Sequence, residues 1–82
     1  MRILGIDPGL ACTGFGVVEV IDNQMKFIDY GAVKTKPKES LNVRLNTIFQ
    51  DLRFIIDQFK PSVMSVEQIN WPKQGKVNCT LY

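Results

Sequence analysis

The sequence predicts an α/β fold in which a mixed β-sheet of at least four strands packs against one helix. Two neighbouring segments rich in β-branched and aromatic residues, separated by a short polar turn, are typical of a β-hairpin. A long segment with apolar residues at helical spacing follows them, and another short apolar segment comes after it. Because a helix between two strands commonly serves as a crossover within one sheet, these segments together predict a mixed sheet.

The first strand is predicted over residues 3–7. This apolar run meets a carboxylate at Asp7, and Pro8 and Gly9 follow directly. Glycine and proline spaced this closely favour a short buried strand over a helix. Asp7 is therefore expected near the end of that strand.

The second and third strands are predicted over residues 13–21 and 26–35, because both segments are rich in β-forming side chains. Residues 22–24, with the sequence Asp-Asn-Gln, are expected to form the turn of a hairpin between them. Gly14 and Gly16 leave part of the second strand without side chains, which indicates either a close backbone approach or a bulge.

A helix is predicted over residues 41–59. Ser40 is expected to be its N-cap, and Pro61 ends it because proline cannot continue a helix. Apolar residues recur at intervals of three and four, as in an amphipathic helix with one face on a core. They are Leu41, Leu45, Ile48, Leu52, Ile55 and Phe59.

The fourth strand is predicted over residues 63–67, again an apolar run that meets a carboxylate, here Glu67. After residue 69 the sequence shows neither a helical nor an alternating pattern. We therefore expect residues 1–69 to be the N-terminal part of one domain and residues 70–82 to be a divergent tail or loop. A single helix cannot cover both faces of an α/β sheet, so only a portion of such a fold is expected.

The composition is that of a folded protein, with 45% hydrophobic and 22% charged residues. The net charge of +2 allows nucleic-acid binding but does not argue for it, because such binding needs basic residues gathered on one face. There is no histidine, and the two cysteines, Cys12 and Cys79, match no metal-binding spacing. Both observations argue against a zinc site.

The chain is expected to be cytoplasmic. Its N-terminal apolar run is too short for a secretory signal or a membrane span. Two isolated cysteines in a chain without a secretory signal are typical of reduced thiols in a cytosolic protein. No contact with a membrane is expected.

Asp7 and Glu67 are the candidate functional residues, because each stands at the end of a strongly apolar strand. Burying a charge without a partner is costly. A divalent cation would offset that cost, and Mg²⁺ prefers oxygen ligands. Two carboxylates on neighbouring strand ends could hold one or two Mg²⁺ ions that act on a phosphodiester. Either residue alone is more commonly a solvated loop residue or a turn cap, and the pairing leaves both interpretations open.

Three further features have a functional and a structural interpretation. The glycine-rich residues 13–16 could approach a phosphate backbone, although a glycine bulge within a hairpin is favoured. Lys34, Lys36 and Lys38 could meet DNA phosphates, although a solvated linker is favoured. Trp71 could stack on an exposed base or cover an edge of the core.

Five motifs spread over the first 69 residues point to a known family. They are residues 1–10 (MRILGIDPGL), 13–17 (TGFGV), 30–35 (YGAVKT), Arg44-Leu45 with Ile48, and 66–68 (VEQ). Together they resemble, in this order, the N-terminal strands, third strand, first helix and fourth strand of the RuvC family of bacterial Holliday-junction resolvases. The Asp-Pro-Gly after the first strand, with Glu-Gln at this distance, is more specific than a general strand pattern.

The resemblance implies a ribonuclease-H-like fold and the activity of a crossover junction endodeoxyribonuclease. This family cuts four-way (Holliday) DNA junctions in recombination and repair by Mg²⁺-dependent hydrolysis of phosphodiesters. Asp7 matches its first-strand acid and Glu67 its fourth-strand acid, so both are implied to be catalytic residues and metal ligands. The family works as a homodimer and has a branch-migration helicase complex as a further partner. The resemblance assigns no DNA-contacting residue in this chain.

The sequence departs from the family in its length. The family's further acids near the carboxyl terminus, its dimer helix and its later strand have no counterpart here, so we expect a truncated chain that is inactive by itself. The alternative is a non-catalytic remnant of the same fold that binds DNA or a protein partner. A third hypothesis is the nucleotide-binding half of an actin-like or sugar-kinase ATPase, which Pro8 and the Glu67-Gln68 pair fit less well.

Overall fold

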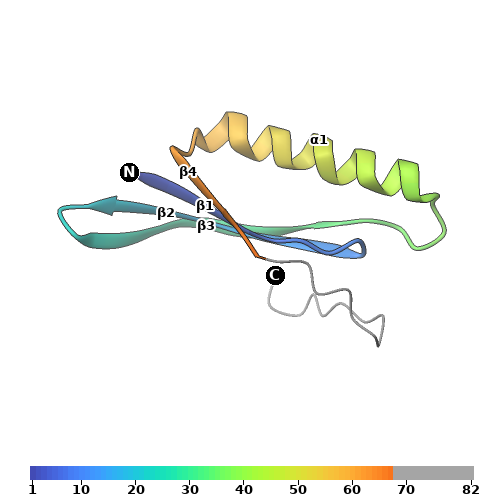
Figure 1. Cartoon of the computed structure of the whole chain (residues 1–82), viewed down its shortest axis with the longest axis horizontal. Coiled ribbons are helices and arrows are strands. Elements are labelled where there is room, and N and C mark those ends of the chain that lie inside the picture. The colour runs from blue at the N-terminus through green and yellow to red at the C-terminus, as the bar shows by residue number, and fades with distance from the viewer. Residues whose placement is uncertain (68–82) are drawn as a thin grey trace.

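The computed structural model describes residues 1–67, which form a four-stranded sheet with one helix. The strand order is β3-β2-β1-β4, in which β1 pairs antiparallel with β2 and parallel with β4, and β2 pairs antiparallel with β3. Figure 1 shows α1 lying along one face of this sheet. The elements are β1 (Arg2–Asp7), β2 (Cys12–Ile21), β3 (Gln24–Lys34), α1 (Leu41–Phe59) and β4 (Val63–Val66). The predicted arrangement of three antiparallel strands, one helix and a fourth strand is confirmed.

The β2–β3 hairpin turns at Asp22 and Asn23, whose φ angles of 52° and 64° lie in the left-handed region. Two consecutive residues with positive φ are typical of a type I′ turn, whose twist matches that of the flanking strands. Aspartate and asparagine tolerate this conformation better than other residues with a side chain. The turn predicted from the sequence therefore has a local physical cause.

The irregularity in the β2–β3 pairing lies beyond the glycines of β2, and its extra residue, Ile28, is on β3. The pairing of β2 with β3 shifts register between Val17 and Val18, whereas Gly14 and Gly16 are in regular register with both neighbouring strands. The glycine bulge favoured by the sequence is therefore wrong. A bulge needs an extra residue opposite the partner strand, and these glycines instead leave a stretch of one sheet face without side chains.

Both ends of α1 are capped, and the N-cap is Ser40 as the sequence predicts. The hydroxyl of Ser40 accepts a hydrogen bond from the amide of Val43 at 3.4 Å. At the other end, Lys60 adopts the left-handed conformation with a φ of 49°, and its amide donates to the carbonyl of Ile56 at 2.8 Å. Pro61 follows and prevents a further turn.

The hydrophobic core lies between α1 and the face of the sheet that the helix covers. Its buried members are Leu4, Ile6, Val17, Val33 and Ile55. Side chains alternate between the two faces of a sheet along each strand. Leu4 and Ile6 therefore point toward α1, and Gly5 and Asp7 belong to the opposite face.

Arg2 connects the end of α1 to the sheet. Its guanidinium donates to the carbonyl of Phe59 at 3.0 Å and to the carboxylate of Glu19 at 3.2 and 3.3 Å. The N-terminal amine of Met1 lies 3.1 Å from the same carboxylate. The hydrogen bond from this amine, followed by the interaction with Arg2, holds the pKa of Glu19 below its usual value, because both positive groups favour the charged form.

Three further expectations concern the tail, the cysteines and membranes. Residues 68–82, with Trp71, lie outside the described residues, so the predicted tail or loop stays a prediction. Cys12 is 3% exposed. Cys79 lies outside the described residues, so the expectation for the pair of cysteines stays a prediction. Within residues 1–67, no helix is long and apolar enough to cross a membrane.

Candidate metal centre

The two predicted acids stand at the ends of neighbouring parallel strands. The register pairs Ile6 of β1 with Val66 of β4, and the amide of Glu67 donates a 3.0 Å hydrogen bond to the carbonyl of Ile6. Glu67 therefore lies beside Asp7 at the carboxyl ends of these two parallel strands. The structure brings together two carboxylates that are far apart in the sequence.

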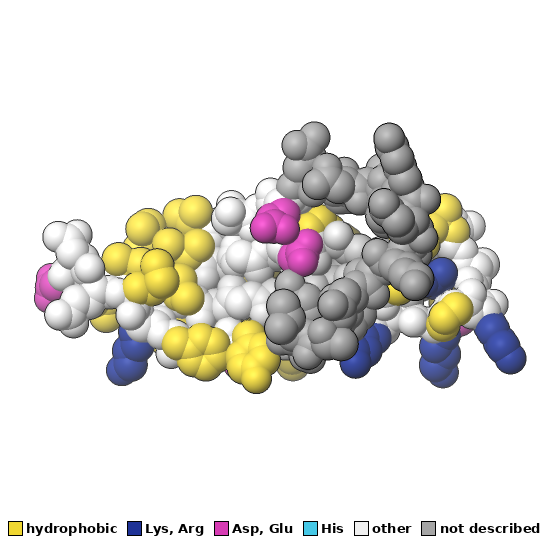
Figure 2. All heavy atoms as spheres, turned by 90° about the horizontal axis from the view of Figure 1, so that it is seen from below, with side chains coloured by type: hydrophobic (Ala, Val, Ile, Leu, Met, Phe, Trp, Pro, Cys, Tyr) yellow, Lys and Arg dark blue, Asp and Glu magenta, His cyan; other side chains and the backbone are white. Residues whose placement is uncertain are grey.

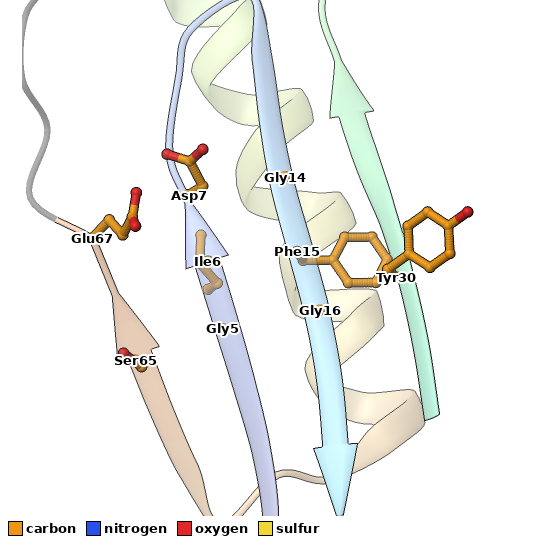
Figure 3. A pocket seen from close by; sticks show the side chains of 9 residues that line it. All are labelled: Gly5, Ile6, Asp7, Gly14, Phe15, Gly16, Tyr30, Ser65 and Glu67. Carbon is orange, nitrogen blue, oxygen red and sulfur yellow. The ribbon is translucent and has the colours of Figure 1, made fainter. Parts of the chain in front are cut away.

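Both carboxylates lie on the face of the sheet away from α1. In Figure 3, Asp7 and Glu67 occupy adjacent strand ends, and the helix lies behind the sheet. Figure 2 looks onto the face opposite α1 and shows two acidic side chains next to each other near its middle. The alternation along β1 gives the same result, because Leu4 and Ile6 enter the core and Asp7 does not.

Asp7 and Glu67 are both exposed, which corrects the expectation that burial of their charge calls for a cation. The reason is positional, since each residue follows one that points to the α1 side of the sheet, Ile6 or Val66, and itself points away from α1. Like charges on directly neighbouring strands are nevertheless unfavourable. Mutual repulsion between two adjacent carboxylates, rather than burial, would therefore favour a cation at this place.

A shallow depression of about 410 Å³ lies beside the acids. Figure 3 shows the residues around it on all four strands. Its lining includes the two acids, three glycines and two hydroxyl-bearing side chains: Asp7, Glu67, Gly5, Gly14, Gly16, Ser65 and Tyr30. The sequence singled out only part of this set. Gly5, Ser65 and Tyr30 were missed because only the strand register shows that they share a face with the acids.

Two threonines hold the loop between β1 and β2, which begins directly after the first acid. Thr13 is 1% exposed; its hydroxyl donates to the carbonyl of Gly9 at 2.8 Å and accepts from the amide of Gly9 at 3.2 Å. The hydroxyl of Thr35 donates to the carbonyl of Leu10 at 2.6 Å and accepts from Nε of Arg44 at 2.9 Å. These bonds tether the loop to β2, to the residue after β3 and, through Arg44, to α1.

The two carboxylates suit Mg²⁺ in kind and in number. Mg²⁺ prefers oxygen ligands, keeps several waters, and is commonly bound through one or two carboxylates together with substrate phosphates. Among residues 1–67 there is no group of three or more His, Cys, Asp or Glu side chains that could hold a metal. A site at Asp7 and Glu67 therefore needs water or phosphate oxygens to complete its coordination.

The structure gives less support to a functional role for the other candidates from the sequence. Lys34, Lys36 and Lys38 are exposed, and Figure 2 shows Lys and Arg side chains spaced along one edge of the face that carries the acidic pair. This placement is compatible with DNA phosphates and with a solvated linker alike. Trp71 lies outside the described residues.

Comparison with known proteins places the chain in a family. The model of the family described as "Crossover junction endodeoxyribonuclease RuvC" matches residues 3–81, which include both strand-end acids. The chain belongs to the RuvC family. RuvC of Desulforamulus reducens is 43% identical over 76 residues, which are 93% of this chain. The chain spans about half the length of the curated RuvC relatives it matches, 47% and 49% of two of them.

Solved structures confirm the ribonuclease-H-like fold. RuvC from T. thermophilus in complex with a Holliday junction substrate has a TM-score of 0.79 and 29% identity, over 90% of this chain and 48% of that one. The Aquifex aeolicus PPX-GPPA enzyme has a TM-score of 0.60 at 18% identity, over 80% of this chain and 25% of that one. At this identity the second likeness shows the fold alone, so it does not favour the ATPase hypothesis over RuvC.

Proposed function

We propose that this chain supplies two metal-binding carboxylates, Asp7 and Glu67, to the active site of a Mg²⁺-dependent crossover junction endodeoxyribonuclease. Its substrate is the four-way DNA junction of recombination and repair. The observation that carries the proposal is the position of both acids side by side on one face, at the ends of β1 and β4. The likeness to T. thermophilus RuvC, whose structure contains a Holliday junction substrate, supports DNA as the ligand.

The charges of the site explain why a cation belongs to the proposal. Neighbouring strands are spaced by about 4.8 Å, so Asp7 and Glu67 repel each other, and both repel a DNA phosphate. When bound, Mg²⁺ supplies positive charge that stabilises the developing charge on the phosphate oxygens. The two carboxylates hold and orient this charge, and the bonds of Thr13 and Thr35 to the loop limit movement of the backbone that follows Asp7.

The proposal includes the partners that the family resemblance implies. These are a homodimer and a branch-migration helicase complex. The cytoplasmic location expected from the sequence is also part of the proposal. Within residues 1–67, Asp7 and Glu67 are not joined by a third side chain that could hold a metal. We therefore expect metal-dependent junction binding by this chain and little or no cutting without further ligands.

The experiment measures binding and cutting of a fluorescently labelled four-way junction in Mg²⁺ and in EDTA. Mg²⁺ is expected to raise the junction affinity of the unmodified chain, and Asp7→Asn and Glu67→Gln are each expected to remove that increase. Asp57→Asn is the matched control, because Asp57 is exposed on α1, away from the acidic pair. An increase that survives in both site variants would show that these acids are not the ligands.

One observation favours a second candidate function, a non-catalytic remnant of the fold that binds DNA or a protein partner. Within residues 1–67, the two acids at the strand ends are not joined by a third His, Cys, Asp or Glu side chain that could hold a metal. This candidate predicts junction binding of equal strength in Mg²⁺ and EDTA, with no cutting. The same binding and cutting measurements therefore distinguish the two functions.

A further inference from the structure

A row of the sheet next to the acidic pair lacks side chains at its centre. The strand pairing places Ser65, Gly5, Gly16 and Tyr30 side by side across β4, β1, β2 and β3. This row lies two residues from the acids along the strands, on the same face. We call the bare strip over Gly5 and Gly16, bounded by Ser65 and Tyr30, the glycine trough.

The fold does not need glycine at position 5 or 16, the two residues that form the floor of the trough. A Cβ built on Gly16 would meet no heavy atom within 4 Å, and one on Gly5 would meet only the carbonyl oxygen of Gly16 at 3.9 Å, an ordinary contact. Neither residue has a φ in the left-handed region. Gly31 differs, because its Cβ would lie 2.8 Å from the ring of Phe15. Glycine weakens a strand and often marks a place where a ligand or another backbone approaches closely.

The glycine trough is large enough for a small flat chemical group. It belongs to the depression of about 410 Å³ that also contains both acids. Three strand spacings separate the Cα atoms of Ser65 and Tyr30 by about 14 Å. Two residues along a strand place the row about 7 Å from the acids, which is comparable to one nucleotide of an extended DNA strand.

An aromatic side chain stands at one end of the trough. Tyr30 is 57% exposed, and its ring packs against Phe27, which is 61% exposed, with ring centroids 5.6 Å apart. In Figure 3 the Tyr30 ring extends along the β3 side, away from Asp7 and Glu67, so it leaves the floor uncovered. An exposed ring fixed by a neighbour offers a preformed surface for stacking.

We propose that the glycine trough receives one nucleoside of the DNA strand whose phosphate lies at Asp7 and Glu67, and that Tyr30 contacts its base. The inference rests on the proposed function and names where the neighbouring nucleotide lies. A phosphate does not suit the trough, because its charged neighbours are the two carboxylates. An uncharged sugar and base suit a shallow floor of backbone that ends at an aromatic ring.

The first test adds one methyl group to the floor. Gly16→Ala is tolerated sterically, because nothing lies within 4 Å of the new Cβ. Val18→Ile is the matched control, since Val18 lies on the same face of β2, one row further from the acids, and is paired with Ile3. The unmodified chain and both variants are titrated with a labelled four-way junction in Mg²⁺. We expect Gly16→Ala to weaken junction binding about tenfold, as one misplaced methyl group does in a fitted site, and Val18→Ile to leave it unchanged.

The second test changes the aromatic end of the trough. Tyr30→Ala is expected to weaken junction binding about tenfold, because it removes a stacking surface, whereas Tyr30→Phe keeps the ring and is expected to bind normally. Thermal melting of each variant separates loss of binding from loss of fold. Gly16→Ala should melt no lower than the unmodified chain, because glycine is the weaker strand former.

The possible results separate this inference from the proposed function. If Gly16→Ala and Val18→Ile bind the junction equally well and Asp7→Asn still loses the Mg²⁺ dependence, the nucleoside does not lie in the glycine trough. The proposed metal site is unaffected by that result. Weaker binding by Gly16→Ala at unchanged Mg²⁺ affinity supports it. If the unmodified chain does not bind the junction at any Mg²⁺ concentration, the proposal for the glycine trough is wrong. Thermal melting with and without Mg²⁺ then decides whether the acids bind the metal.

Discussion

The backbone amide of Glu67 donates a 3.0 Å hydrogen bond to the carbonyl of Ile6, the residue that precedes Asp7. This bond continues the β1–β4 pairing one residue beyond the end of β4. A register slip of one residue would move every side chain of β4 to the other face, and Glu67 would then face the side of α1. The strand register therefore decides whether the two acids meet.

The tether on the loop after Asp7 gives a first prediction. Thr13→Val keeps the shape of the buried side chain but leaves the amide and carbonyl of Gly9 without their hydroxyl partner. We expect the free energy of unfolding in urea to fall by about 1–3 kcal/mol, the cost of such unpaired groups. Thr47→Val on α1 is the control, because its hydroxyl bonds Val43 at an exposed site, and it should change stability by less than about 0.5 kcal/mol. Equal effects of the two variants would contradict the role of Thr13.

Local signals in the sequence predicted much of the fold. The helix bounds follow from the spacing of apolar residues, from the cap at Ser40 and from Pro61, and the structure confirms them. The hairpin turn follows from Asp22 and Asn23, which tolerate positive φ. Strand ends differ by one or two residues, because the last residues of a strand depend on pairing with a neighbour and not on their own side chains.

The site was harder to predict, because it depends on register between distant segments. The sequence named Asp7 and Glu67 as a pair, and the structure brings them together, but the expected burial of their charge is wrong. Burial depends on which face α1 covers, and an apolar strand that is hidden on one face looks the same as one hidden on both. Gly5 and Gly16 lie side by side only because of the β1–β2 pairing, which the sequence does not reveal.

The ion pairs of Glu19 predict a pH dependence. Its pKa is lowered in the folded protein, first by the N-terminal amine and then by Arg2. The stabilisation is therefore fully present above the ordinary value of 4.5 and is lost as the pH falls through the lowered pKa. Glu19→Gln should melt below the unmodified chain at pH 7, and the difference should shrink under acidic conditions. A difference that is the same at pH 7 and pH 3, or that Asp57→Asn reproduces, would contradict this assignment.

The end of α1 predicts a stabilising substitution. Lys60 has a φ of 49°, a conformation that is unfavourable for residues with a side chain and open to glycine. Lys60→Gly keeps the amide that bonds Ile56 and should raise the free energy of unfolding by about 0.5–1 kcal/mol. Gln58→Gly, inside the helix, should lower it by about 1 kcal/mol. If both glycines destabilise the protein alike, the left-handed cap does not carry strain.

Thermal melting with and without Mg²⁺ tests the central claim most directly, because a ligand that binds only the folded state raises its stability. At a Mg²⁺ concentration about a hundred times the dissociation constant, the gain is about 2.7 kcal/mol, which raises the melting temperature of a domain of this size by about 10–20 °C. We predict this rise for the unmodified chain and its loss in Asp7→Asn and in Glu67→Gln, with NaCl of matched ionic strength as the control. A rise of equal size in all three proteins, or none in the unmodified chain, would contradict a cation shared by Asp7 and Glu67.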